Sequence, residues 1–384
     1  MKALKGFWVI LSLVSILVSF ARAASLSERV APEPEPSLHV LLLDACLLPE
    51  DLDFFRGKHL RVEFITSAKP ALKRVFNSEI CMSHYRRAVG DAGAVVEFHS
   101  NFLGTKMASH QEVIRVVDRI VKKRGPLDFV VANNSDQAAY IASFVRAHLG
   151  QQTPWQNVPK PENFYDKYQM KTNLRKNAPD IRTADFVALD ASEIELNQFL
   201  QRADFPQQPI ILKKRRSAGS VGILVMHSMK DYIAMKKKVK DKHNYLIEKF
   251  IRGRVFRVAG ERIDHKLKFV IPSINFTSPY EHYKLAKPRA TTSIDDTIVA
   301  GKDFYQFTDK VLDALEMVSG TFHLEGILSD QDDELYFMEI ALRVGEGNMD
   351  APHREVFGYH AKRAYFFKQF PQGYFSEEDE QHYV

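Results

Sequence analysis

Two glutamates lie inside apolar segments near the C-terminal end of the chain. Glu325 falls within residues 322–328, and Glu339 falls within residues 335–341. The polar segment between these runs predicts the turn of a β-hairpin, and a turn centred near Asp332 would place the two side chains opposite each other at roughly 4.5–5.5 Å. Carboxylates at that distance repel each other unless a cation lies between them, and Mg²⁺ takes oxygen ligands of this kind. A register shifted by one residue would instead leave two unrelated glutamates on solvated faces.

An arginine follows the second glutamate at a spacing that keeps both on one side of the strand. Because side chains alternate along a strand, Ala341 and Arg343 are expected to share the face of Glu339. Arg343 would then supply positive charge beside a phosphate or a substrate carboxylate.

Basic residues in the middle of the chain form a second candidate group. Lys213 ends an apolar strand predicted over residues 209–213, and a loop of small and basic residues, 214–222, follows it. Such a turn can direct several backbone amides at a phosphate, and Lys213 can neutralise the phosphate charge. The loop contains neither GxxxxGKS/T nor GxGxxG, so no Walker A or Rossmann site is predicted. The same stretch also fits a plain basic hairpin on the surface.

The segments that must position these residues alternate between strands and helices in the N-terminal part. Short apolar runs predict buried parallel strands, and amphipathic spacing predicts helices. The predicted strands cover residues 39–43, 60–66, 94–98 and 127–132, and the predicted helices cover residues 110–123 and 136–149. This alternation indicates an α/β fold with a doubly wound parallel sheet.

A second subdomain is expected after residues 155–161, a loop with two prolines. Helices are predicted over residues 163–175 and 303–317, and a lysine-rich helix is predicted after Ser228, which caps it with Asp231 three residues later. Strands are predicted over residues 209–213, 222–226, 245–249, 255–259, 266–271, 322–329 and 335–341.

Length and composition describe an ordinary folded protein. The chain has 384 residues, with 45% hydrophobic and 26% charged residues, which fits two or three packed subdomains. The net charge of +5 is weaker than nucleic-acid binders usually show, and no aromatic residues interleave with the basic run 214–216, so no nucleic-acid partner is expected. The cysteines Cys46 and Cys81 form no CxxC pair, so no zinc site is predicted, while one disulfide and two free thiols both stay open.

The first residues have the layout of a secretory signal peptide. Lys2 and Lys5 precede an apolar run over residues 7–20, and residues 21–23 offer a small-residue cleavage site. The run is shorter than the ~20 residues that span a bilayer, and an uncleaved segment that anchors the protein to a membrane is the alternative. The alternating prolines at 31–36 predict a stiff linker.

Five motifs occur in an order that resembles the ATP-grasp superfamily. Members of that superfamily show a DK pair, an apolar strand ending in Lys, a Gly/Ser loop, a vEefi-G hinge and paired acidic strands ending in E-x-N-x-R. The corresponding segments here are Asp166-Lys167, Ile-Leu-Lys213, Ser217-Ala-Gly-Ser220, Tyr245-Leu-Ile-Glu-Lys-Phe-Ile-Arg-Gly253, His323-Leu-Glu325 and Phe337-Met-Glu-Ile-Ala-Leu-Arg343. The resemblance covers roughly residues 38–360. It implies an N-terminal parallel-sheet (pre-ATP-grasp) subdomain followed by two α+β lobes.

The resemblance also implies a chemistry and a set of site residues. Members of the superfamily activate a carboxylate as an acyl phosphate with ATP and release ADP when an amine or another nucleophile attacks, which needs no side-chain nucleophile. ATP and Mg²⁺ (or Mn²⁺) are the implied cofactors, and small-molecule carboxylates and amines, among them amino acids or peptides, are the implied substrates. By position, the nucleotide-binding residues would be Lys167, Lys213, Ser217, Gly219, Ser220, Glu248, Lys249, Phe250 and Ile251, the metal ligands Glu325 and Glu339, and the catalytic residue Arg343.

Three departures from the superfamily pattern leave a second interpretation open. The usual Asn of E-x-N-x-R is Ala341 here, although E-x-A-x-R followed by Gly345 and Gly347 is similar to the amino-acid ligase branch. The acidic residue that often contacts ribose after the hinge is absent, and the phosphate loop carries one glycine where relatives often have several. A nucleotide-binding pseudoenzyme or regulatory module with the same fold is therefore the alternative to a ligase.

The boundaries that follow from these motifs divide the chain into five parts. They are the signal peptide at 1–23, a linker at 24–37, the pre-ATP-grasp subdomain at 38–155, the ATP-grasp domain at 156–370 and an acidic tail at 371–384. The signal peptide predicts export (secreted, periplasmic or lumenal), although a ligase needs a compartment that contains ATP. The sequons at Asn133 and Asn275 matter only in a eukaryotic secretory pathway.

Overall fold

The computed structural model describes the strands and helices that frame the candidate site. It covers residues 38–43, 60–65, 95–98, 109–132, 135–151, 153, 155–217, 220–278, 281–282, 287–288, 290–294, 301–345, 358 and 361–370. The predicted signal peptide, linker and acidic tail lie outside the described residues, as do Cys46, Cys81, Asn133, Gly219 and Gly347. Within the described part, no helix combines the length and the apolar character that crossing a membrane requires.

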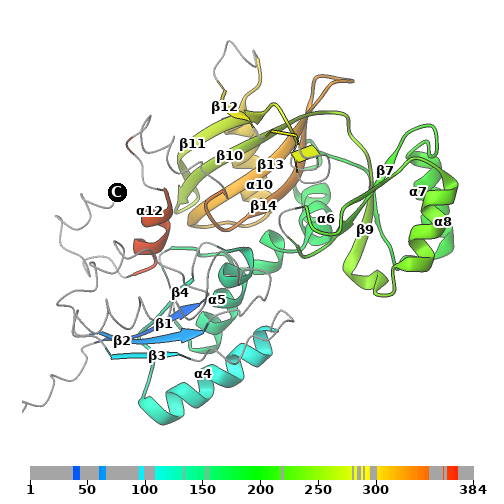
Figure 1. The fold of residues 1–384 in the computed structure, drawn as a ribbon. Coiled ribbons are helices and arrows are strands. Elements are labelled where there is room, and N and C mark those ends of the chain that lie inside the picture. Colours follow the sequence, from blue (N-terminus) through cyan, green and yellow to red (C-terminus); the bar gives the residue numbers. More distant parts are fainter. Residues whose placement is uncertain are drawn as a thin grey trace, which may run out of the picture.

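The N-terminal part forms the parallel sheet that the alternating pattern predicts (Figure 1). Its strand order is β3-β2-β1-β4, and each neighbouring pair is parallel. The elements are β1 (Leu38–Leu43), β2 (Leu60–Ile65), β3 (Val95–Phe98), α4 (His110–Arg124), β4 (Phe129–Ala132) and α5 (Asp136–His148). Both helices pack on the sheet face that Leu41, Leu43 and Val130 present.

Local sequence signals explain where the two N-terminal helices begin. Ser109 caps α4 by accepting a hydrogen bond from the backbone of Glu112, and the Glu112 side chain accepts one from the Ser109 backbone, which completes a capping box. Ser135 caps α5 through the backbone amide of Ala138. The cap thereby fixes Asp136, the first residue of α5, shortly after the C-terminal end of β4.

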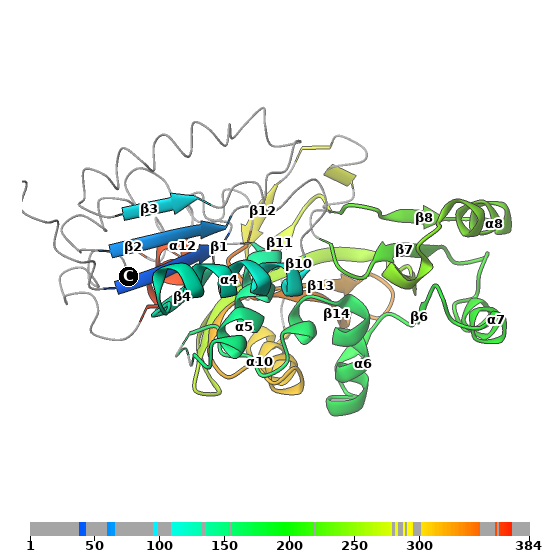
Figure 2. The ribbon, with the colours of Figure 1, turned by 90° about the horizontal axis from the view of Figure 1, so that it is seen from below.

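A small antiparallel lobe follows in the middle of the chain, at the end of the molecule opposite to the parallel sheet (Figures 1 and 2). Its strand order is β6-β9-β7-β8, and α7 and α8 pack on one face around Phe199, Leu212 and Met226. The elements are β6 (Phe186–Ala188), α7 (Glu193–Arg202), β7 (Ile210–Lys214), β8 (Leu224–Met226), α8 (Met229–Lys238), the short 3-10 helix η4 (Lys242–Asn244) and β9 (Tyr245–Lys249).

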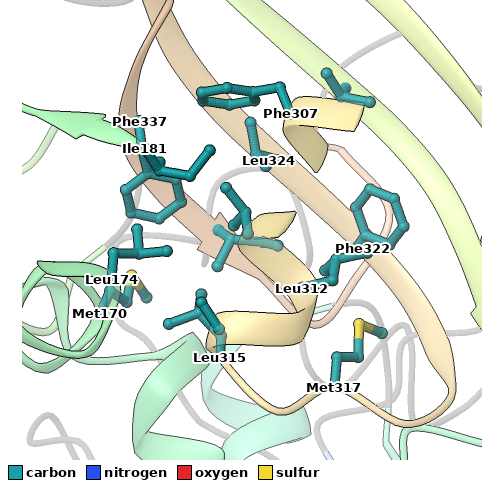
Figure 3. Close-up of a cluster of buried hydrophobic side chains, with 14 of the residues drawn as sticks. Met170, Leu174, Ile181, Phe307, Leu312, Leu315, Met317, Phe322, Leu324 and Phe337 are labelled. Carbon is teal, nitrogen blue, oxygen red and sulfur yellow. The ribbon is translucent and has the colours of Figure 1, made fainter. Parts of the chain in front are cut away.

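A larger lobe is built on a six-stranded sheet of order β12-β11-β10-β13-β14-β5. The elements are β5 (Arg182–Thr183), β10 (Gly253–Ile263), β11 (Lys266–Asn275), β12 (Thr291–Ser293), β13 (Gly320–Ser329), β14 (Leu335–Ala341), α6 (Lys167–Asn177) and α10 (Phe304–Ala314). Helices α6 and α10 cover one face, and their apolar side chains pack against Phe322, Leu324 and Phe337 of β13 and β14 (Figure 3). The predicted fold class, a parallel-sheet subdomain followed by two α+β lobes, is confirmed.

One predicted helix begins later than the pattern indicated. The helix expected over residues 163–175 is divided into a 3-10 helix, η3 (Pro161–Phe164), and α6, which begins at Lys167. Asp166 sets the boundary, because its side chain accepts hydrogen bonds from the backbone amides of Tyr168 and Gln169.

The C-terminal helix α12 (Ala361–Phe367) leads to a residue that closes the free edge of the parallel sheet. The amide of Gln369 accepts a hydrogen bond from the Ala132 backbone N–H at 2.8 Å and donates one to the Ala132 carbonyl at 2.9 Å. It also accepts one from Arg146 of α5 at 2.8 Å. Gln369 thus replaces a neighbouring strand at β4 and ties the end of the chain to the N-terminal subdomain.

Candidate active site

A cleft of about 460 Å³ lies between the small and the large lobe, and Asp136 of the N-terminal subdomain reaches its wall. Every described residue that the sequence assigned to a site lines this one cleft, namely Lys167, Lys213, Ser217, Ser220, Glu248, Lys249, Phe250, Ile251, Glu325, Glu339 and Arg343. Gly219 lies outside the described residues. The structure therefore gathers residues that are up to 176 positions apart in the chain, from Lys167 to Arg343 (343 − 167), while their individual roles stay predictions.

The two glutamates of the hairpin are direct cross-strand partners, as predicted. The register at the glutamates is the expected one, but toward the turn it shifts by one residue, so that Gly326 pairs with Phe337. Met338 is therefore the extra residue of a β-bulge, and without it Glu325 would lie opposite Met338. A Cβ at Gly326 would lie 2.2 Å from the ring of Phe256 and 2.6 Å from the Tyr336 carbonyl oxygen, so any larger residue would force the ring and the strand to shift.

Two side chains, His323 and Arg257, contact the same carboxylate oxygen of Glu325. His323 Nε2 lies 3.2 Å from Glu325 Oε1, and Arg257 Nε lies 3.0 Å from the same atom. Burial alone would raise the pKa of Glu325, but the hydrogen bond from His323 and the charge of Arg257 hold it well below its usual range. The carboxylate is thus kept ionised inside the cleft.

Glu339 is paired with the first of the two predicted phosphate-binding lysines. Lys167 Nζ lies 2.8 Å from Glu339 Oε2 and also donates a hydrogen bond to the Ser217 carbonyl at 2.6 Å. Burial alone would lower the pKa of Lys167, but the carboxylate of Glu339 raises it overall. The sequence predicted two repelling carboxylates, whereas in the structure each has its own cationic partner.

Glu248 lies between two lysines on the other side of the cleft. Lys213 Nζ is 2.9 Å from one carboxylate oxygen, and Lys171 Nζ is 3.3 Å from the other. Burial alone would raise the pKa of Glu248, but both lysine charges lower it overall, whereas burial lowers the pKa of Lys171 to about 8. The side chain of Glu248 therefore orients Lys213, while the following residues, 249–251, form the wall of the cleft.

Arg343 is bound by a residue of the N-terminal subdomain. Its Nε and Nη2 atoms both donate to the carboxylate of Asp136, the second at 3.2 Å, and its Nη1 donates to the Val344 carbonyl at 2.9 Å. The guanidinium is largely buried, with 8% of the side chain exposed. This contact joins the acidic hairpin to the start of α5.

Four residues of the cleft were missed by sequence reasoning, and three of them had a local signal. Lys171 follows Lys167 by one helical turn, which places both on the same face of α6. His323 precedes Glu325 by two residues and so shares its strand face. Asp136 follows a strand end and a serine cap. Arg257 pairs with Glu325 across β10 and β13, which only the sheet order reveals.

The hairpin carboxylates fit a divalent cation of the Mg²⁺ type. Within the described ranges, no three His, Cys, Asp or Glu side chains converge into a metal cluster. The adjacent Glu325 and Glu339 would therefore supply two hard oxygen ligands and leave the remaining positions to phosphate and water, which is how Mg²⁺ is commonly held. The lysines on both sides of the cleft would complement the phosphates of such a complex.

Comparison with known proteins finds the same fold in several solved enzymes. The sequence matches no family model and no curated protein. The structure is similar to an L-amino acid ligase from Bacillus licheniformis, with a TM-score of 0.56 and 15% identity over 88% of this chain and 75% of that chain. It is also similar to a phosphoribosylglycinamide synthetase from Anaerococcus prevotii, with a TM-score of 0.54 and 16% identity over 86% and 75% of the two chains. A third similar structure is an N5-carboxyaminoimidazole synthase from Aspergillus clavatus in complex with ADP and 5-aminoimidazole ribonucleotide, with a TM-score of 0.54 and 16% identity over 88% and 79%.

Proposed function

We propose that this chain, which has the ATP-grasp fold, is an ATP-dependent, ADP-forming carboxylate–amine ligase that acts through an acyl phosphate. The observation that carries the proposal is the cleft in which two lysines, two paired glutamates and a buried arginine meet. The solved structures of this fold cited above are named as a ligase, a synthetase and a synthase, and one of them contains ADP. This supports the general reaction type, and amino acids or peptides are the substrates that we propose.

In the proposed reaction, a carboxylate oxygen of the substrate attacks the γ-phosphorus of ATP, and the bond from that phosphorus to ADP breaks. An amine then attacks the acyl carbon, phosphate leaves with the acyl oxygen, and the amine gives its proton to the solvent. Lys167 and Lys213 would bind ATP phosphates, and Arg343 would stabilise the transferred phosphoryl group. When bound, Mg²⁺ (or Mn²⁺) would neutralise phosphate charge, and Glu325 and Glu339 would hold it.

The test is ADP release with a panel of amino acids as both carboxylate and amine, with Mg²⁺ and with Mn²⁺. The proposal expects ADP release that requires both substrates. Lys213→Met should lower kcat/KM for ATP roughly 100-fold, because a preorganised charge at the transferred group is lost. Lys230→Met on the exposed face of α8 is the matched control and should leave turnover unchanged.

A second candidate function is favoured by one specific feature of the hairpin. Ala341 lies where related proteins carry a metal-binding Asn, so the site has one oxygen ligand fewer. A nucleotide-binding pseudoenzyme or regulatory module would bind Mg–ATP and release no ADP with any pair of substrates. That result would replace the ligase proposal, since binding alone is common to both functions.

We also propose that the protein is exported by its N-terminal signal peptide. The support is the sequence alone, namely two lysines, an apolar run over residues 7–20 and small residues at 21 and 23. A mature chain that starts at Ala24 in an exported fraction is the expected result of N-terminal sequencing. A full-length chain in a membrane fraction would indicate an anchor, and a full-length soluble chain in the cytoplasm would exclude export.

A further inference from the structure

One acidic residue of the cleft has no role in the proposed chemistry. Among the described lining residues, the acids are Asp136, Glu248, Glu281, Glu325 and Glu339. Glu248 orients two lysines, Glu325 and Glu339 belong to the hairpin, and Glu281 is bound by Lys287 and Ser278. Asp136 differs from these because it comes from another subdomain and meets the predicted catalytic residue, Arg343.

Asp136 retains hydrogen-bonding capacity toward the cleft. A carboxylate can accept about four hydrogen bonds, and Arg343 uses one position on each oxygen of Asp136. The Asp136 side chain is 16% exposed and lines the cleft, so its remaining lone pairs are accessible to a ligand. Arg343 does not have to leave for a second donor to bind there.

An aromatic ring lines the same cleft as this carboxylate. Tyr165 lines the cleft and stacks on Tyr140 with ring centroids 4.4 Å apart. Burial and, after it, the charge of Asp136 raise the pKa of Tyr165 above its ordinary value. A carboxylate beside an aromatic ring attracts an ammonium group by charge and by the ring quadrupole.

We propose that Asp136 and Arg343 together recognise the zwitterionic end of an α-amino acid, which is then the carboxylate that the enzyme activates. This inference rests on the proposed function and names its substrate class. An α-amino acid carries a carboxylate and an ammonium group on neighbouring carbons, and the Asp136–Arg343 pair presents the opposite charges side by side. Arg343 binds the carboxylate at the point of phosphoryl transfer, and Asp136 accepts hydrogen bonds from the ammonium group.

One assay compares two kinds of carboxylate substrate, with and without an amino group. Hydroxylamine serves as the nucleophile, so that any acyl phosphate is trapped as a hydroxamate, whichever amine the enzyme normally uses. L-Alanine, L-leucine and L-phenylalanine are compared with the matching acids without the amino group, propionate, 4-methylpentanoate and 3-phenylpropionate. The expected result is hydroxamate from at least one amino acid and at least about 10-fold less from its deaminated counterpart, because a hydrogen bond to a charged group is lost.

A variant tests the residue itself. Asp136→Asn keeps the size of the side chain and one acceptor oxygen for Arg343 but removes the charge. It should raise KM for the amino acid about 10- to 100-fold, leave KM for ATP unchanged and remove the preference over the deaminated acid. A purely structural role would instead lower turnover of both acids equally. Asp180→Asn, in an exposed ion pair with Lys310, is the matched control and should change none of these values.

The outcomes distinguish this inference from the function on which it rests. If deaminated acids form hydroxamate as fast as amino acids, or if Asp136→Asn keeps the preference, the ammonium site is wrong and the ligase proposal stands. If neither kind of acid yields hydroxamate or ADP, the ligase proposal falls, and the inference falls with it.

Discussion

Lys167 of α6 and Glu339 of β14 form an ion pair with 2.8 Å between Nζ and Oε2. A predicted phosphate-binding residue and a predicted metal ligand therefore neutralise each other inside the cleft. An ATP–metal complex would exchange this contact for two others, in which the ammonium group meets phosphate and the carboxylate meets the cation. Both new contacts also join opposite charges. The exchange therefore leaves neither buried charge unpaired, and an unpaired buried charge would be strongly destabilising.

Glu339→Gln tests this pair through activity and stability together. ADP release should fall below detection, because one of two proposed cation ligands loses its charge. The free energy of unfolding should fall by about 1–3 kcal/mol, because the buried Lys167 loses the charge of its partner. Urea denaturation and an ADP assay measure the two effects. Glu334→Gln on the exposed turn of the same hairpin is the control, and intact activity in Glu339→Gln would refute the metal assignment.

Lys171→Met tests the buried lysine beside Glu248 through the pH dependence of stability. The pKa of Lys171 is about 8 in the folded protein against 10.5 for an ordinary lysine, and burial is the main cause. Between these pH values the unfolded chain binds more protons, so this residue makes the stability of the wild type rise with pH. Between pH 8 and 10.5, the free energy of unfolding of the wild type should therefore rise relative to that of Lys171→Met by at most about 3 kcal/mol.

The measurement is urea unfolding of both proteins at several pH values across that window. Lys230→Met removes an exposed lysine from α8 and serves as the control, for which the difference from the wild type should not change with pH. A constant difference between wild type and Lys171→Met would mean that Lys171 keeps an ordinary pKa in the fold.

The sequence predicted those parts of the fold that depend on local periodicity. The strands over residues 245–249 and 335–341 have the predicted bounds in the structure, because both are continuous apolar runs with a charged residue inside. The helix α7 was not predicted, although Ser192 and Glu195 form a capping box and Leu196, Phe199 and Leu200 have helical spacing. These local signals are sufficient to predict a helix.

Other features depend on contacts between distant segments and have no local signature. The bulge at Met338 brings Glu325 opposite Glu339, and it occurs where the ring of Phe256 lies over Gly326. The two-residue strand β5 joins the large sheet next to β14, too short for any pattern to reveal. The partner of Arg343, Asp136, comes from another subdomain, and the partners of the other site residues come from other strands and helices. The sequence could therefore identify the charged residues of the cleft but not what binds them.

Gln369→Ala tests the contact that closes the edge of the parallel sheet. The variant leaves the backbone N–H and carbonyl of Ala132 without their partner and removes an acceptor of Arg146. The free energy of unfolding should fall by about 2–4 kcal/mol, because several buried polar groups lose hydrogen bonds at once. Hydrogen exchange of the Ala132 amide should accelerate as well. Gln306→Ala on the exposed side of α10 is the control, and an unchanged exchange rate at Ala132 would contradict the role of Gln369.

The fold buries Asn275, the glycan-accepting residue of one of the two sequons. It is 2% exposed in β11, and its side chain accepts a hydrogen bond from the Thr291 hydroxyl at 2.8 Å. A glycan would have to separate β11 from β12, so the folded protein made in a eukaryotic secretory pathway should carry none at this residue, as peptide mass spectrometry can show. Asp190→Asn creates an exposed Asn-Ala-Ser sequon as a positive control, which should be occupied. Glycan on Asn275 in soluble, folded protein would mean that β11 and β12 are not paired as described.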